Sequence, residues 1–247
     1  MNSPVNPWPR RIERAQVLER EHPAAAELLR FYRTIAAFQK TVAQALVLAA
    51  SRLVSTRSLP EPLRPHIQPL LTLLQQKAPP PLADAAAVLS LTDDWDPADP
   101  APRFVTRVLL QPYMEAQARR ASAAPCSPGS TCPFCNESPV AAILRPEGEG
   151  GKRSLLCSLC FTEWDFRRLL CPNCGEEDHQ KLPVYTAEQF PHIRIEACDT
   201  CHTYLKSIDL TRNGLAVPEV DELAALPLDL WAAKNHYIKL QPNLFGL

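Results

Sequence analysis

The sequence of 247 residues is poor in glycine and contains no long apolar run. Seven glycines, none of them in a phosphate-binding pattern, argue against a nucleotide cradle. The longest apolar stretch, residues 43–50, is interrupted by Gln44 and is too short to cross a membrane. The first ten residues hold three prolines and no apolar segment, which is unlike a secretory signal peptide. We therefore expect a cytoplasmic protein without membrane insertion.

Catalytic patterns are missing as well. No Ser/His/Asp spacing and no pair of carboxylates in an apolar setting stands out. The chain also lacks the alternation of strands and helices in which a thioredoxin-like dithiol would sit. The sequence therefore predicts a protein that is not an enzyme.

Cysteine is absent from residues 1–125, and all nine cysteines lie in residues 126–247. The charge balance changes at the same point, because the first part carries 15 Lys/Arg against 11 Asp/Glu and the second carries 11 against 16. Residues 121–130 are rich in Pro, Gly and Ser and are typical of a linker, in which Cys126 is expected to be incidental. These features predict two domains, residues 1–125 and residues 126–247.

The first domain is expected to be entirely helical. Apolar residues recur at steps of three and four from Leu28 to Leu53, which is the spacing of one buried helix face. A short segment at about residues 9–21 precedes this face. Further helices are predicted at about residues 66–76, 80–91 and 103–120, with proline-rich breaks between some of them.

Four Cys-x-x-Cys pairs, here called knuckles, organise the second domain. One such pair has many uses, but the first and third are each followed by another pair 25 or 27 residues later, which indicates two metal sites with four cysteine ligands each. The predicted ligands are Cys132, Cys135, Cys157 and Cys160 in one site, and Cys171, Cys174, Cys198 and Cys201 in the other. A cross-brace that pairs the first knuckle with the third is the alternative. Four thiolates suit zinc or a single iron, and disulfides are not expected in a reducing cytosol.

Alternating apolar residues around the knuckles predict two near-copies of one β unit, at about residues 131–170 and 171–210. In each unit a hairpin joins the two knuckles and a third strand follows. A helix at about residues 221–235, interrupted near Pro227, and an apolar tail complete a C-terminal segment at about residues 218–247. The predicted fold class is α+β, an all-α domain followed by two tandem four-cysteine units and a short C-terminal helix.

The residue after the second cysteine of a knuckle often needs a left-handed backbone. Gly175 accepts this conformation readily and Asn136 is the next most tolerant type, whereas the Cys157/Cys160 and Cys198/Cys201 knuckles have neither. His179 and His202 lie near knuckles, but each unit already has four sulfurs, so we expect surface or supporting positions for both.

Charge also bears on the kind of partner. The second domain has a net charge of 11 − 16 = −5, and each four-thiolate site with a divalent ion adds about −2. Nucleic-acid binding, a frequent role of zinc ribbons, needs a basic face. The acidic balance of this domain therefore argues against that role. A site closed by four sulfurs has no open position for catalysis, so the sites are expected to hold a protein-binding surface in shape.

Several motifs around the knuckles, in order along the chain, resemble the formate dehydrogenase accessory protein family, FdhE. They comprise residues 110–113, the first knuckle with residues 137–140, and residues 157–164, 196–206 and 242–246. The resemblance covers the chain from about residue 104 to residue 247, and the first hundred residues are less distinctive.

The resemblance implies a cytoplasmic, non-catalytic maturation factor that binds the catalytic subunit of formate dehydrogenase. It also implies a rubredoxin-like cysteine domain, which favours iron over zinc as the two bound metal ions; Asn136 departs from the glycine of a rubredoxin-style first knuckle. Two alternatives stay open, a one-electron redox partner of the same client and a zinc-ribbon nucleic-acid binder. The oligomeric state is left open.

Overall fold

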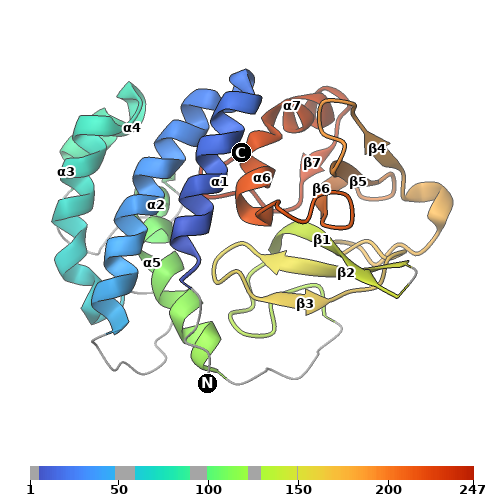
Figure 1. Cartoon of the computed structure of the whole chain (residues 1–247), viewed down its shortest axis with the longest axis horizontal. Helices are drawn as coiled ribbons and strands as arrows, with labels where there is room; N and C mark the ends of the chain where they lie inside the picture. The colour runs from blue at the N-terminus through green and yellow to red at the C-terminus, as the bar shows by residue number, and fades with distance from the viewer. Residues whose placement is uncertain (1–5, 48–58, 90–98, 122–128, 149) are drawn as a thin grey trace.

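The computed structural model describes residues 6–47, 59–89, 99–121, 129–148 and 150–247. A layer of helices from the first half of the chain lies beside a β-sheet from the second half, and two C-terminal helices cover part of that sheet (Figure 1). No helix within these described ranges is both long and apolar enough to cross a membrane.

Five α-helices form the helical layer. They are α1 (Trp8–Glu21), α2 (Ala26–Val47), α3 (Ile67–Lys77), α4 (Pro80–Val88) and α5 (Pro100–Arg120). Helices α1 and α2 pack side by side and α2 packs on α5, while α3 and α4 lie at the end farthest from the sheet (Figure 1). The predicted all-helical character of this part is confirmed over the described residues, and the end of the apolar stripe at Leu53 lies outside them.

Prolines set several of these helix boundaries. Pro80 opens α4, and Pro69 falls in the first turn of α3, where its missing N–H has no intrahelical partner to lose. Helix α5 begins at Pro100, three residues before the predicted start, and continues through Pro112.

The second half of the chain forms one seven-stranded sheet. Its strands are β1 (Pro139–Glu147), β2 (Gly150–Cys157), β3 (Glu163–Asp165), β4 (Val184–Thr186), β5 (Ile193–Cys198), β6 (Thr203–Asp209) and β7 (Ile238–Lys239). The order is β3-β2-β1-β6-β5-β4, with β7 parallel to the start of β6. The predicted hairpin and third strand are present in each unit. Strand β4 starts only at Val184, after a short 3-10 turn at residues 179–181 that is capped by the Asp178 side chain.

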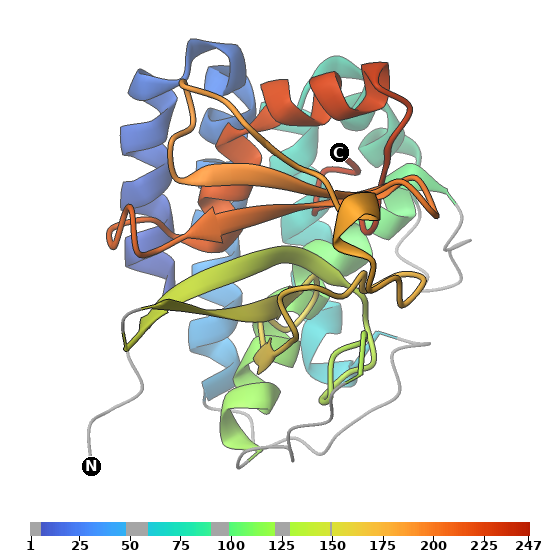
Figure 2. The ribbon, with the colours of Figure 1, turned by 90° about the vertical axis from the view of Figure 1, so that its right-hand side faces the viewer.

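The two four-cysteine units share this sheet through a parallel seam. Strand β1 of the first unit pairs with β6 of the second, with Ala142 opposite Ser207 and Leu144 opposite Asp209. Figure 2 shows the β1–β2 hairpin beside strands β5 and β6 in one twisted sheet in front of the helices. The near-copies are therefore joined edge to edge, a relation that the sequence did not predict.

The C-terminal helices are α6 (Pro218–Ala224) and α7 (Leu226–Lys234). The break between them lies at Ala225, and Pro227 falls in the first turn of α7, so the interruption predicted near Pro227 is confirmed.

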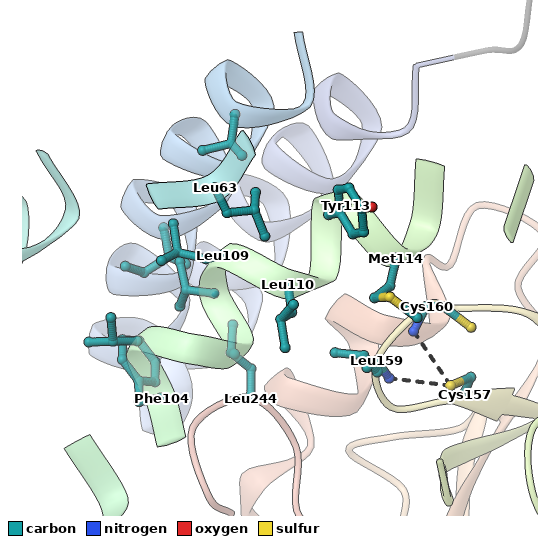
Figure 3. Packing of buried hydrophobic residues seen from close by; sticks show 14 of the residues in the cluster. Leu63, Phe104, Leu109, Leu110, Tyr113, Met114, Cys157, Leu159, Cys160 and Leu244 are labelled. Carbon is teal, nitrogen blue, oxygen red and sulfur yellow. Dashed lines mark hydrogen bonds between the residues drawn. The ribbon is translucent and has the colours of Figure 1, made fainter. Parts of the chain in front are cut away.

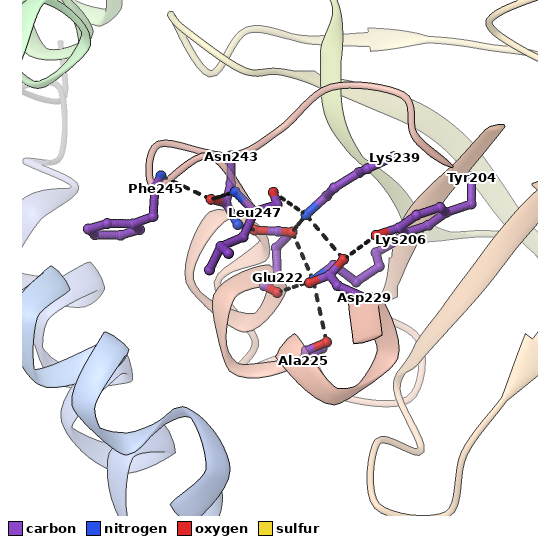
Figure 4. A network of polar contacts seen from close by, with 9 residues as sticks. All are labelled: Tyr204, Lys206, Glu222, Ala225, Asp229, Lys239, Asn243, Phe245 and Leu247. Carbon is purple, nitrogen blue, oxygen red and sulfur yellow. Dashed lines mark hydrogen bonds and ion pairs between the residues drawn. The ribbon is translucent and has the colours of Figure 1, made fainter. Parts of the chain in front are cut away.

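A buried ionic network binds these helices to the sheet (Figure 4). The fully buried Lys206 of β6 lies 2.8 Å from the carboxylate of Glu222 and 2.6 Å from that of Asp229. Lys239 pairs with the same two carboxylates, and the Tyr204 hydroxyl donates to Asp229 at 2.7 Å. Two ammonium groups thus balance two carboxylates, which is the condition under which buried charge is tolerated.

The apolar tail docks on the helical layer. The Phe245 ring lies 5.8 Å from that of Phe31 and 5.7 Å from that of Phe104, centroid to centroid, and Leu244 is buried beside them. The apolar tail identified in the sequence thus packs on the protein's own core. The division at residue 125 stays a prediction, because residues 122–128, which include Cys126, lie outside the described ranges.

Candidate metal centres

The eight predicted ligands gather in two groups of four. Within each group all four sulfurs lie within 4.8 Å of one another. Site one contains Cys132, Cys135, Cys157 and Cys160, and site two contains Cys171, Cys174, Cys198 and Cys201. The sequential grouping is therefore the one present, and the cross-brace alternative is wrong.

Sulfur separations fit a metal and not disulfides. They run from 3.4 to 3.6 Å in site one and from 3.6 to 3.7 Å in site two for the closest pairs. A disulfide needs about 2.0 Å between its sulfurs. A tetrahedron with metal–sulfur bonds of about 2.3 Å has an edge of about 3.8 Å. The donor set suits zinc or a single iron, and its geometry does not separate the two.

All four knuckles share one unusual backbone conformation. The residue after the second cysteine has a positive φ in each, at 62° for Asn136, 54° for Phe161, 76° for Gly175 and 55° for His202. The expectation for Asn136 and Gly175 is confirmed. Phe161 and His202 adopt the same conformation although neither residue type favours it, so the tertiary structure holds them there.

The two units also repeat their hydrogen bonds. The Cys132 N–H donates to the Glu137 carbonyl and the Cys171 N–H to the Glu176 carbonyl, both at 2.9 Å. Two residues beyond the fourth cysteine, a threonine hydroxyl lies 3.1 Å from that cysteine's sulfur, Thr162 in site one and Thr203 in site two. Backbone N–H groups also point at the sulfur of Cys157, at 3.4 and 3.5 Å. Such donors stabilise thiolate ligands and fix their orientation.

Site one lies inside the main hydrophobic core. Cys132, Cys157 and Cys160 are at most 2 % exposed and belong to the same apolar cluster as α5. Figure 3 shows Met114 of α5 and Leu159 beside the Cys157/Cys160 knuckle. Water is therefore excluded from three of the four sulfurs.

Polar side chains of α5 also hold this knuckle. Arg107 and Gln111 both donate to the Ser158 carbonyl, at 3.0 and 3.2 Å, and Arg107 pairs with Glu137 at 3.5 Å. On the other side, the buried Arg11 guanidinium of α1 lies over the Phe161 ring at 4.5 Å and makes a two-pronged ion pair with Glu115. Site one is thus tied to two helices of the first half of the chain.

Site two lies at the surface. Cys174 is exposed, Cys201 is partly exposed, and only Cys171 and Cys198 are buried. Its knuckles are joined by polar contacts, since the Thr200 hydroxyl donates to Glu176 at 2.6 Å. None of its cysteines belongs to an apolar cluster of the described core.

Acidity differs between two thiols of site two. Burial raises the pKa of Cys198 to about 12. Burial also opposes ionisation of Cys201, but hydrogen bonds from the side chains of Thr203 and Asn173 outweigh it and lower the Cys201 pKa to about 6. A bound cation favours the thiolate at every ligand, so metal binding would release protons.

The neighbouring histidines do not join either group. The side chain of His179 is 74 % exposed, and His202 is exposed with its ring 6.3 Å from that of Tyr237. Sequence reasoning missed the supporting roles of Arg11, Gln111 and Phe161. No local signal marks the first two, because their partners lie more than forty residues away.

Sequence matches to known proteins lie in the second half of the chain. Residues 131–168 match the family model "FdhE, central domain", and residues 169–245 match "FdhE, C-terminal domain". The "Protein FdhE homolog" of Aquifex aeolicus is 39% identical over 116 residues, 47% of this chain and 41% of that protein. The homolog of Pseudomonas aeruginosa is 36% identical over 118 residues, 46% and 38% of the two chains. The matched part thus spans about two fifths of each relative.

The overall fold is also similar to a solved structure. The crystal structure of the FdhE protein from Pseudomonas aeruginosa superposes with a TM-score of 0.70 over 99% of this chain and 97% of that one, at 24% identity. At this identity the likeness establishes the fold alone. It extends to the helical layer, which the family models do not reach.

Proposed function

Because this chain belongs to the FdhE family, we propose that it is an accessory protein in the maturation of formate dehydrogenase. In this proposal it acts in the cytoplasm, is not an enzyme, and binds the catalytic subunit of formate dehydrogenase as its client. Two metal ions hold the client-binding part in shape. One observation carries the proposal: two groups of four cysteines lie at the ends of hairpins that share one continuous sheet. A metal with four sulfur ligands has no free position for a substrate, so its role is structural or one-electron.

The proposed ligands are Cys132, Cys135, Cys157 and Cys160 in site one, and Cys171, Cys174, Cys198 and Cys201 in site two. Sulfur spacing supports a tetrahedral ion in each. The family resemblance favours iron, and zinc is the alternative that the donor set equally accepts.

A one-electron role is the second candidate, and the exposure of site two favours it. Cys174 is exposed, so an electron could pass between this site and a docked partner without crossing a layer of core side chains. Site one lacks such access, since three of its sulfurs are buried. This candidate requires iron at site two, because zinc has no redox chemistry.

The test of the main proposal is capture of the catalytic subunit by the tagged full-length protein. We expect the subunit to co-purify, and we expect formate dehydrogenase activity to fall in a strain that lacks this gene. A deletion strain with fully active formate dehydrogenase would contradict the proposal.

Metal analysis and an absorbance spectrum of freshly purified protein separate the two candidates. A thiolate-to-iron charge-transfer band that bleaches on reduction and returns on oxidation supports the redox role. Zinc at both sites in protein from iron-replete cells would exclude it and leave the structural role.

A further inference from the structure

A basic groove lies beside site two on the sheet face opposite α7. We define it by Arg153, Arg168, Leu169, Val184, Arg194 and Glu196, which line a hollow of about 230 Å³ together with Cys171 and Cys198. A second, more open hollow continues from it and shares Arg153, Arg168 and Leu170. The two hollows thus form one continuous depression next to the exposed metal site.

Two large apolar side chains of the groove are open to solvent. Leu169 is 56% exposed and Val184 is 51% exposed, and they lie on different segments that both line the hollow. Leu205 of β6 is buried and also contributes to the lining. An apolar side chain of a partner could therefore enter the groove and remove apolar surface from water.

Positive charge in the groove exceeds the charge that balances it. Arg153 and Arg194 both pair with the single carboxylate of Glu196, at 2.8 and 3.0 Å. The Arg153 side chain is only 3% exposed, so water screens the charge of its guanidinium group little. Arg168 is exposed and has no ion pair with any residue in the described part of the chain. Among the charged side chains of the groove, three arginines thus meet one carboxylate, an excess of two positive charges. Metal-loaded site two, which contributes Cys171 and Cys198 to the lining, carries about −2 in total.

This excess contrasts with the rest of the second half, whose sequence has a net charge of −5. Near the groove, Lys152 is balanced by Asp165 and Arg167 by Glu177. The arginine excess thus lies in the groove, where Arg168 and Arg194 can pair with the carboxylates of a short acidic ligand. A long polyanion such as RNA would have to extend over acidic surface.

The edge of the sheet adjoins the groove. Strand β4 is the last strand in the sheet order, and its outer edge pairs with no other strand among the described residues. Val184 belongs to β4 and also lines the groove. An extended peptide could hydrogen-bond to such an edge while its side chains enter the neighbouring pocket.

We infer that the basic groove binds an extended, acidic segment of the client protein, with an aliphatic side chain against Leu169 and Val184 and carboxylates at Arg168 and Arg194. The inference rests on the proposed function for the identity of the client. The chemistry of the segment follows from the groove alone.

The test is an array of short overlapping peptides that tile the catalytic subunit of formate dehydrogenase, probed with the full-length protein. We expect the bound peptides to be acidic and to contain an aliphatic residue. Arg168→Glu and Leu169→Asp should each weaken binding about tenfold or more, the loss expected when a charge pair or a buried apolar contact is replaced by repulsion or desolvation.

Two matched controls lie outside the groove. Arg212 has a side chain that is 64% exposed, and Leu215 is 79% exposed, so Arg212→Glu and Leu215→Asp make the same chemical changes elsewhere on the surface. Both controls should bind the peptides as the unchanged protein does. Replacing the acidic residues of a bound peptide with lysine should restore its binding to the Arg168→Glu variant, which a merely destabilised variant could not show.

The outcomes separate the inference from the proposed function. If the unchanged protein captures the full-length subunit and the groove variants capture it equally well, the groove inference is wrong and the proposed function stands. If the unchanged protein captures neither subunit nor peptides, both are wrong. Stronger binding of a labelled single-stranded RNA that competes with the peptides and is lost in Arg168→Glu would also overturn the inference.

Discussion

The two four-cysteine sites have nearly the same local backbone and different surroundings. Both use two knuckles joined by a hairpin, a left-handed residue after the second and fourth cysteines, and a threonine hydroxyl near the fourth sulfur. Site one lies under α5 in the apolar core, whereas site two presents Cys174 to solvent. The local motif therefore sets the ligand geometry, and the tertiary setting decides whether a site can stabilise the whole fold or contact a partner.

The largest expected difference between the sites is in stability. Cys157→Ser and Cys198→Ser alter the same position of the two units, and both sulfurs are buried. We expect Cys157→Ser to prevent cooperative folding, because a structural metal contributes about 10–16 kcal/mol of binding free energy and a domain is stable by only about 5–15 kcal/mol. Cys198→Ser should lose one metal ion and keep its helices.

Circular dichroism at 222 nm during thermal unfolding, with metal analysis of the same samples, measures this difference. Equal loss of helical signal in both variants would show that site two supports the helical layer as much as site one does. That result would contradict the expected difference in stability between the two sites.

Acid should act on the second unit through the buried charges of Figure 4. Burial opposes ionisation of Glu222, but Lys206 and Lys239 outweigh it and lower its pKa to about 2. A carboxylate whose pKa is lowered by folding stabilises the folded state above its ordinary pKa of 4.5, and this contribution disappears as the pH falls through 2. At 1.36 kcal/mol per pKa unit, the contribution at pH 7 is about 3 kcal/mol.

Denaturant unfolding of the unchanged protein and of Glu222→Gln, each from pH 7 to pH 2, isolates this effect. The variant should be less stable at pH 7, and the difference should shrink as the pH falls. Release of metal by acid affects both proteins and cancels in the difference. The exposed Glu188→Gln is the control, and a constant difference between Glu222→Gln and the unchanged protein would contradict the assignment.

Much of each unit could be predicted from local sequence, because knuckle spacing and strand alternation act over a few residues. The eight grouped sulfurs, the hairpins and the left-handed Asn136 and Gly175 follow from that information. The β1–β6 seam could not be predicted, because pairing between two units leaves no pattern within either. Lys206 is fully buried within a predicted strand, and only its distant partners Glu222 and Asp229 explain this position.

Phe161 tests whether the setting of site one, and not its backbone alone, stabilises the knuckle. Phe161→Gly would relieve the left-handed backbone but remove the ring that lies under Arg11. We expect a net loss of about 2 kcal/mol in the free energy of unfolding, since the lost packing and cation–π contact outweigh the relieved strain. Phe161→Leu, which keeps apolar bulk, separates the two contributions in the same denaturant measurement.

Metal exchange should follow exposure. A strong chelator is expected to remove the metal of site two about tenfold faster than that of site one, because release from a surface site needs only local opening. One equivalent should leave early without loss of helical signal, and the second should leave together with unfolding. Simultaneous release of both ions would mean that the sites open as one unit.

The smallest expected effect is at His202, the counterpart of Phe161 in site two. Its side chain is exposed, so His202→Gly removes little packing while relieving a positive φ of 55°. Strain of about 1–3 kcal/mol for such a residue exceeds the roughly 0.4–1 kcal/mol that glycine costs by loosening the unfolded chain. We therefore expect stabilisation of about 0.5 kcal/mol or more, measured by denaturant unfolding of metal-loaded protein, where Phe161→Gly destabilises. Destabilisation by His202→Gly would indicate that the contact of its ring with Tyr237 supports site two as Arg11 and Phe161 support site one.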